Sequence, residues 1–164
     1  MGFLDKLLGA KKAEEILILS PVQGEAVALS EVSDPTFGEE ILGKGIAIRP
    51  SNGRIVSPVD GSVELMFDTG HAVSILSDAG TEVLVHVGLD TVKLEGKHYK
   101  IHTASGNKVK AGDLLMEFDI DAIKADGYDT ITPIIICNTA AYTKVESFIG
   151  KQVNELDKVI SLTK

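Results

Sequence analysis

The chain has 164 residues, of which 44% are hydrophobic, and its 24 acidic residues outnumber its 16 basic ones to give a net charge of −8. This length and composition predict a single globular domain with a buried core, and the negative charge argues against a nucleic-acid partner. A single cysteine, Cys137 in the run ITPIIICNTA, excludes a disulfide framework and a cysteine-based zinc site, and we interpret it as a buried, unreactive thiol.

The first 15 residues differ in pattern from the rest. Phe3, Leu4, Leu7 and Leu8 recur at helical spacing before the charged run KKAEE, which is typical of a short amphipathic helix. Residues 2–9 are a candidate for weak contact with a membrane surface, and packing on the chain's own domain or disorder explain the pattern equally well. No apolar run reaches the ~18 residues of a membrane span and no signal-peptide core is present, so we expect a cytoplasmic protein whose domain covers residues 16–164.

From Ile16 onward the hydrophobic pattern has a period of two. β-Branched residues form short segments separated by Gly, Pro, Asp and Ser. This pattern predicts an all-β, antiparallel sandwich or barrel, with one short helix expected within residues 139–153. The expected strands cover residues 16–20, 24–30, 45–49, 54–57, 61–67, 71–77, 81–88, 114–118, 131–137 and 157–162.

One stretch of sequence occurs twice. The run 18-ILSPVQGEAVAL-29 returns 37 residues later as 55-IVSPVDGSVELM-66. We interpret the pair as a duplicated hairpin unit rather than as a turn signature used twice. The same phrase, with 108-KVKAGDLLMEFD-119, looks like the strands of lipoyl- and biotinyl-carrier domains, but the lysine that such carriers need at a hairpin tip does not occur where the repeat would place it.

The segment 71-HAVSILSDAGTEVLVH-86 has a histidine at each end of an apolar stretch. If it is a hairpin whose turn is centred on residues 78–79, His71 faces His86 across the ladder, with Cβ atoms roughly 4.5–5.5 Å apart. A three-residue loop ending in Gly80 would shift this register by one residue.

The expected register also predicts which residues surround the two histidines. Period-two alternation places Val73, Leu84 and Gly88 on their face, and the register continued outward pairs Thr69 with Gly88 and Phe67 with Asp90.

Three interpretations fit two imidazoles on an apolar face. They are core histidines bonded to backbone carbonyls, ligands of a zinc ion that needs a third protein ligand such as Asp90, or groups that carry a covalent adduct. Two buried imidazoles leave several polar nitrogens in need of partners, which favours a functional pair.

The string 80-GTEVLVHVGLDTVKLEG-96 closely resembles the active-site signature of the glucose-family enzyme IIA of the bacterial sugar phosphotransferase system. The segments 35-PTFGEEILGKGIAIRPSNGRIVSPVDGSV-63 and 106-GNKVKAGDLLMEFD-119 resemble the same family, and 2-GFLDKLLG-9 has a counterpart in its amphipathic N-terminus. The segment 97-KHYKIHTASG-106 follows the family pattern only loosely, so His98 and His102 inherit no role and are expected in exposed loops.

The resemblance implies a phosphocarrier without a cofactor or metal. It would accept a phosphoryl group from the phosphohistidine of HPr and pass it to a cysteine of the enzyme IIB domain of a sugar permease. By position in the motif, Nε2 of His86 carries the phosphoryl group, His71 supports it, Thr69 orients His71, and the carbonyl of Gly88 accepts a hydrogen bond from Nδ1 of His86.

The resemblance also implies a surface that contacts HPr and enzyme IIB in turn, on a chain that we expect to be a monomer. Its apolar rim would consist of Phe37, Leu42, Phe67, Leu84 and Val92, and its acidic positions would be Asp34 and Asp90. A zinc-binding protein and a lipoyl- or biotinyl-type carrier stay open as alternatives.

Overall fold

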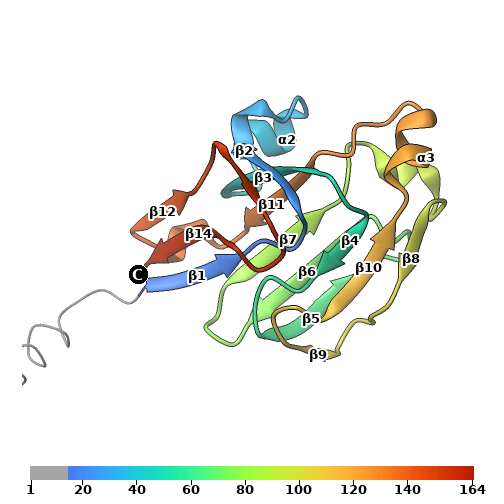
Figure 1. The fold of residues 1–164 in the computed structure, drawn as a ribbon. Helices are drawn as coiled ribbons and strands as arrows, with labels where there is room; N and C mark the ends of the chain where they lie inside the picture. The colour runs from blue at the N-terminus through green and yellow to red at the C-terminus, as the bar shows by residue number, and fades with distance from the viewer. Residues whose placement is uncertain (1–14) are drawn as a thin grey trace, which may run out of the picture.

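The structure, a computed structural model, describes residues 15–164, and the predicted tail lies almost wholly outside this range (Figure 1). Every strand pairing within the described residues is antiparallel, which confirms the expected all-β class with minor short helices. The strands are β1 (Glu15–Leu19), β2 (Gly24–Ala28), β3 (Lys44–Pro50), β4 (Arg54–Val56), β5 (Gly61–Met66), β6 (Ala72–Ser77), β7 (Glu82–His86), β8 (Tyr99–Ile101), β9 (Lys108–Val109), β10 (Leu114–Phe118), β11 (Thr132–Ile136), β12 (Lys144–Ser147), β13 (Lys151–Val153) and β14 (Lys158–Thr163). The helical segments are α2 (Pro35–Gly38), α3 (Ile120–Ala125) and the 3-10 turns η1 (Leu29–Glu31), η2 (Thr91–Leu94) and η3 (Thr139–Ala141).

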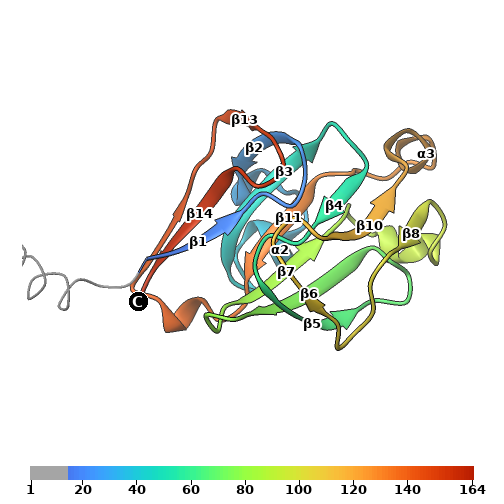
Figure 2. The same ribbon diagram turned by 60° about the horizontal axis from the view of Figure 1, so that its bottom comes forward.

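The strands form three sheets around one main core. The largest has the order β13-β2-β3-β11-β7-β6-β5-β9, and two three-stranded sheets have the orders β1-β14-β12 and β4-β10-β8 (Figures 1 and 2). The main core takes side chains from all three sheets, among them Ile18, Ile48 and Met116, each with no exposed surface. The apolar alternation of the sequence therefore specifies the inner face of a sandwich.

Strand β7 shows how that alternation places the site. Val83 and Val85 point into the main core and are fully buried, so Glu82, Leu84 and His86 lie on the other face of the large sheet. A second, smaller core covers that face, where Leu84 packs among buried residues that include Phe37 of α2. His86 thus ends a buried strand on the face of the sheet that α2 covers.

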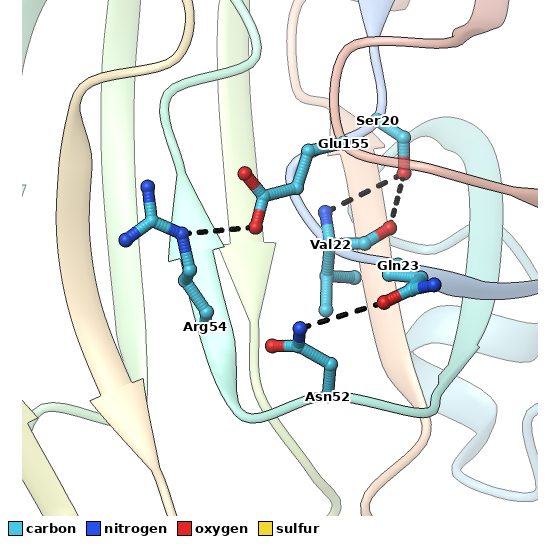
Figure 3. Close-up of polar contacts among 6 residues, drawn as sticks. All are labelled: Ser20, Val22, Gln23, Asn52, Arg54 and Glu155. Carbon is cyan, nitrogen blue, oxygen red and sulfur yellow. Dashed lines mark hydrogen bonds and ion pairs between the residues drawn. The ribbon is translucent and has the colours of Figure 1, made fainter.

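The duplicated hairpin unit is visible in the hydrogen-bond pattern of the two copies. Ser20 Oγ donates a hydrogen bond to Val22 O (2.7 Å), and in the second copy Ser57 Oγ donates to Val59 O (2.6 Å). The two copies also bond to each other, since the N–H of Leu19 reaches Pro58 O and its counterpart, the N–H of Val56, reaches Pro21 O. Figure 3 shows the first copy beside the strand of the second, where Arg54 and Glu155 form an ion pair of 3.0 Å.

The duplication extends to segments that the sequence comparison missed. Strand β13 pairs with β2 through Val153 opposite Gly24, and β9 pairs with β5 through Val109 opposite Gly61. Strands β14 and β10 pair in the same way with β1 and β4, and both pairings contain a register shift. Each copy is therefore built from two separate parts of the chain.

Three expectations need correction or extension. All ten predicted strands are present, but β8, β9, β12 and β13 were not expected. Residues 139–153, where one short helix was expected, hold the 3-10 turn η3 and also two strands. Cys137 follows β11 and is exposed, so the prediction of a buried thiol is wrong. Desolvation and the carboxylates Glu82 and Glu64 nevertheless raise the pKa of its thiol, which disfavours a reactive thiolate.

Candidate functional site

His86 is the last residue of β7, and its Nδ1 lies 2.8 Å from the carbonyl oxygen of Gly88. Because a carbonyl oxygen can only accept, Nδ1 carries the proton and Nε2 keeps its lone pair. Gly88 has φ +89°, and a Cβ built there would lie 2.5 Å from Cγ2 of Thr91 and 2.9 Å from Asp129 O. Glycine is thus required for the bend that brings its carbonyl back to His86.

His71 directly precedes β6 and is 4% exposed. Its Nδ1 is hydrogen-bonded to the hydroxyl of Thr69 in the turn between β5 and β6. That turn closes through the N–H of Gly70, which donates to Phe67 O at 2.8 Å, and Gly70 has the positive φ of +73° that such a turn favours. The turn therefore delivers both His71 and the hydroxyl that orients its ring.

The structure brings the two imidazoles together. Their ring centroids are 5.0 Å apart, and the ring planes are inclined by 81°. Phe37 lies against His86 (4.8 Å between centroids) and Phe67 against His71 (5.3 Å). Both Nδ1 atoms are hydrogen-bonded, so the Nε2 atoms are the ring nitrogens left to interact with a bound group.

The register that predicted this meeting is wrong by one residue. His86 is opposite Ala72, and Val73 is opposite Val85, so Val73 points into the main core rather than toward the histidines. The cause is a three-residue loop at 78–80, closed by the bond from the N–H of Ser77 to Thr81 O. His71 still reaches His86 because it lies outside the regular strand, where its carbonyl accepts the N–H of Val87 at 2.6 Å.

The predicted cross-ladder pairs of Thr69 with Gly88 and of Phe67 with Asp90 are also wrong, because residues 67–70 form a turn instead of continuing the ladder. Thr69 lies in the turn that joins β5 to β6, and Phe67 closes this turn by donating its N–H to Ala72 O at 3.2 Å. Gly88 and Leu89 instead donate their N–H groups to Ile131 O and Asp129 O. The four residues thus support the two histidines from separate loops.

Burial controls the charge of both histidines. Burial and the neighbouring His86 lower the pKa of His71 to about 4. Burial also lowers the pKa of His86, although the Gly88 carbonyl and the carboxylates Asp34 and Asp90 act in the opposite direction. Both rings are therefore neutral at pH 7, as a nucleophilic imidazole must be.

The predicted rim residues differ in exposure. Leu42 and Val92 are 40% and 51% exposed, Phe67 and Leu84 are partly buried, and Phe37 is buried. The exposed side chain of Ile41, beside Leu42, was not predicted. Asp34 caps α2 by accepting the N–H of Thr36, and Asp90 is the residue directly before η2.

Two hydroxyl groups near His86 were also missed. The carbonyl of Val87 accepts hydrogen bonds from Thr91 Oγ1 (2.8 Å) and from the hydroxyl of Tyr99 (2.7 Å). Thr91 belongs to the signature string, but Tyr99 lies in the segment that follows the family pattern loosely, so no sequence signal pointed to it.

The other candidates lie apart from this pair. His98 and His102 bond to the surface carboxylates Asp126 and Glu117. Within residues 15–164 no group of three histidine, cysteine, aspartate or glutamate residues could hold a metal ion. No helix in this range is long and apolar enough to cross a membrane.

Residues 16–142 match the family described as the phosphoenolpyruvate-dependent sugar phosphotransferase system, EIIA 1. The chain belongs to this EIIA family. The glucose-specific EIIA component of Oceanobacillus iheyensis is 44% identical over 155 residues, which cover 92% of this chain and 94% of that protein. The solved glucose permease IIA of Mycoplasma capricolum has a TM-score of 0.83 at 33% identity and covers 90% of this chain and 96% of its own.

Some relatives of this EIIA chain are much longer. The β-glucoside-specific EIIBCA component of Bacillus subtilis is 54% identical over 127 residues, which cover 77% of this chain but 21% of that protein. The chain thus spans about a fifth of the length of such relatives, whose names combine EIIA with EIIB and EIIC. Its membership makes the chain a component of the sugar phosphotransferase system.

Proposed function

We propose that the chain carries a phosphoryl group on Nε2 of His86, accepted from phosphorylated HPr and passed to a cysteine of an enzyme IIB sugar-permease domain. The observation that carries the proposal is the bond from Nδ1 of His86 to Gly88 O, with a second imidazole 5.0 Å away. This arrangement leaves a lone pair on Nε2 beside a potential hydrogen-bond donor. Relatives that combine EIIA with EIIB in one chain support the enzyme IIB acceptor, and HPr as the donor is what EIIA membership implies.

The transfer needs only positioning and charge stabilisation. The lone pair of Nε2 attacks phosphorus as the P–N bond of the HPr phosphohistidine breaks, and the electron pair of that bond returns to the HPr imidazole. When the Thr69 hydroxyl donates to Nδ1 of His71, Nε2 of His71 carries a proton that it can donate to a phosphoryl oxygen. In the second step a cysteine thiolate of enzyme IIB attacks phosphorus and His86 leaves as neutral imidazole.

The apolar surroundings support this chemistry. Phe37 and Phe67 pack on the two rings, and Leu42 and Val92 present exposed apolar surface. A partner seated on this surface would exclude water from the phosphoryl group, which strengthens hydrogen bonds to its oxygens. Because HPr and enzyme IIB would use the same surface in turn, each complex must be transient.

Substitution of His86 tests the proposal directly. The variant His86→Gln should accept no phosphoryl group from radiolabelled phospho-HPr, because an amide offers no comparable nucleophilic nitrogen. His102→Gln is the matched control, since that ring is bonded to Glu117 at the surface, and it should be labelled like the native chain. Label retained by His86→Gln, with the acid lability of phosphohistidine, would disprove the assignment.

The variant His71→Gln separates the two roles. His86 remains, so acceptance from HPr should survive, whereas transfer to an isolated enzyme IIB domain should slow by about 10²–10³, the usual cost of losing one donor to a developing charge. Rapid-quench measurement of both steps distinguishes them. Onward transfer at the native rate would show that His71 does not support the phosphoryl group.

A further inference from the structure

The N–H and C=O groups of Val87 and Gly88, the two residues after His86, are all hydrogen-bonded. Val87 donates its N–H to His71 O, and Gly88 donates its N–H to Ile131 O. The carbonyl between them, that of Val87, accepts two hydroxyl groups, those of Thr91 and Tyr99. The carbonyl of Val87 and the N–H of Gly88 belong to one peptide group, and its orientation determines where the carbonyl of Gly88 points. The carbonyl of Gly88 is the one that accepts the hydrogen bond from Nδ1 of His86.

Tyr99 also contacts the turn that carries His71. A Cβ built on Gly70 would lie 2.9 Å from Cβ of Tyr99, so the backbone of that turn rests directly on the tyrosine. The Tyr99 ring stacks on Phe118 with 6.4 Å between centroids, and β8 pairs with β10 at these two residues. The Tyr99 side chain is thus held in place by the β4-β10-β8 sheet, and it contacts the loops that carry the two histidines.

The hydroxyl of Tyr99 is suited to act as a permanent donor. Burial raises the pKa of Tyr99 to about 12, so the phenol keeps its proton across the physiological range. Thr91 is fully buried and donates to the same oxygen, so the Val87 carbonyl has two donors.

We propose that Tyr99 is a positioning residue, whose hydroxyl holds the Val87 carbonyl so that the Gly88 carbonyl selects the His86 tautomer with a free Nε2. The consequence for phosphoryl transfer rests on the function proposed above, whereas the effect on the tautomer does not. A tyrosine of the three-stranded β4-β10-β8 sheet thereby sets the tautomer of a histidine in the eight-stranded sheet.

The test compares Tyr99→Phe with Tyr142→Phe. The Tyr142 hydroxyl makes one bond, of 2.6 Å to Thr81 Oγ1, next to the end of β7 that is remote from His86. Nitrogen-15 NMR of the His86 ring reports which nitrogen carries the proton in the free chain. Tyr99→Phe should move the His86 signals away from the pure Nδ1–H form and slow acceptance from phospho-HPr by about 2- to 10-fold, the effect expected for one hydrogen bond. Tyr142→Phe should change neither.

A second pair of variants addresses the other donor. Thr91→Ser keeps a hydroxyl and should retain the native tautomer, whereas Tyr99→Phe combined with Thr91→Ser should match Tyr99→Phe alone. Unchanged His86 ring signals in Tyr99→Phe, or an equal change in Tyr142→Phe, would overturn the proposal. Failure of the proposed function is a separate result, because a chain that is never phosphorylated on His86 still reports its tautomer.

Discussion

At the scale of single residues, the site is defined by two histidines that the fold keeps neutral. His71 has less exposed surface than His86. Burial and the neighbouring His86 ring, 5.0 Å away, lower the pKa of His71, because a positive charge on its ring is disfavoured in this apolar setting. An imidazole must be neutral to act as a nucleophile. The burial that removes water from the two rings therefore also keeps them in the reactive state.

This burial predicts a dependence of stability on pH. The unfolded chain takes up protons on histidine near pKa 6.5, whereas His71 in the folded chain stays neutral down to about 4. Stability from this difference is fully present above pH 6.5 and is lost as the pH falls toward 4, by up to about 1.4 kcal/mol per pH unit. Urea unfolding at pH 7 and pH 5 should therefore show a smaller loss for His71→Gln than for the native chain.

The control for this experiment is His102→Gln, which removes a histidine that is paired at the surface with Glu117. It should leave the native difference between the two pH values largely in place, because it leaves the buried His71 ring unchanged. An equal pH dependence in the native chain and His71→Gln would show that burial of this imidazole does not govern acid stability.

The sequence predicted the members of the site better than the way they are assembled. The meeting of His71 with His86 was expected from a two-residue turn, but the actual loop at 78–80 has three residues, and alternation alone would then separate the rings. The irregular residue before β6 restores the contact, and irregular backbone has no periodic signal. The role of Tyr99 could not be predicted for a related reason, since its hydroxyl reaches Val87 from another sheet and not along a strand ladder.

At the scale of elements, the fold contains two copies of one unit. Each copy combines a segment whose repeat is evident in the sequence with a partner segment whose repeat is not. The Ser-Pro-Val-x-Gly stretch is repeated because each copy needs the same buried serine bond and the same proline bend. The partner segments 106–119 and 150–163 keep little more than a glycine, a valine and an aspartate at equal spacing. Gly112 and Leu156 occupy equivalent positions with φ of +97° and +73°, so even the turn glycine is not repeated.

The duplication predicts matched effects of two substitutions. Ser20 and Ser57 are fully buried, and each donates its hydroxyl to a carbonyl two residues ahead. Ser20→Ala and Ser57→Ala should each lower the free energy of unfolding by about 1–3 kcal/mol, because a buried carbonyl loses its donor. Urea denaturation measures both changes. A substantial loss at only one of the two positions would mean that the copies do not share this stabilising bond.

The double variant adds a test of coupling. The copies are linked by the bonds from Leu19 to Pro58 and from Val56 to Pro21, so the two serines support neighbouring parts of one network. The loss in Ser20→Ala combined with Ser57→Ala should therefore differ from the sum of the single losses by about 0.5 kcal/mol or more.

At the scale of the whole molecule, the net charge of −8 acts on any approaching partner. Asp34 and Asp90 lie close enough to His86 to affect its pKa, so part of this negative charge is concentrated beside the candidate nucleophile. Such a field steers a partner with basic surface toward the site and increases the rate of encounter more than the lifetime of the complex. The acidic composition that excluded nucleic acid thus fits a protein partner that carries basic groups.

Acceptance from phospho-HPr should therefore slow as salt is raised, since the screening length falls from about 10 Å at 0.1 M to about 3 Å at 1 M ionic strength. The variant Asp34→Asn with Asp90→Asn should lower the second-order rate constant at low salt by roughly tenfold and weaken its salt dependence. Asparagine suits both positions, because it can cap α2 as Asp34 does and tolerates the φ of +58° at residue 90. Asp78→Asn, a single equivalent charge change in the loop at the other end of the β6–β7 hairpin, should have a far smaller effect per charge removed. Equal slopes of rate against salt in the native chain and the double variant would show that these two carboxylates do not steer the donor, and that any salt effect arises from the net charge of the whole surface.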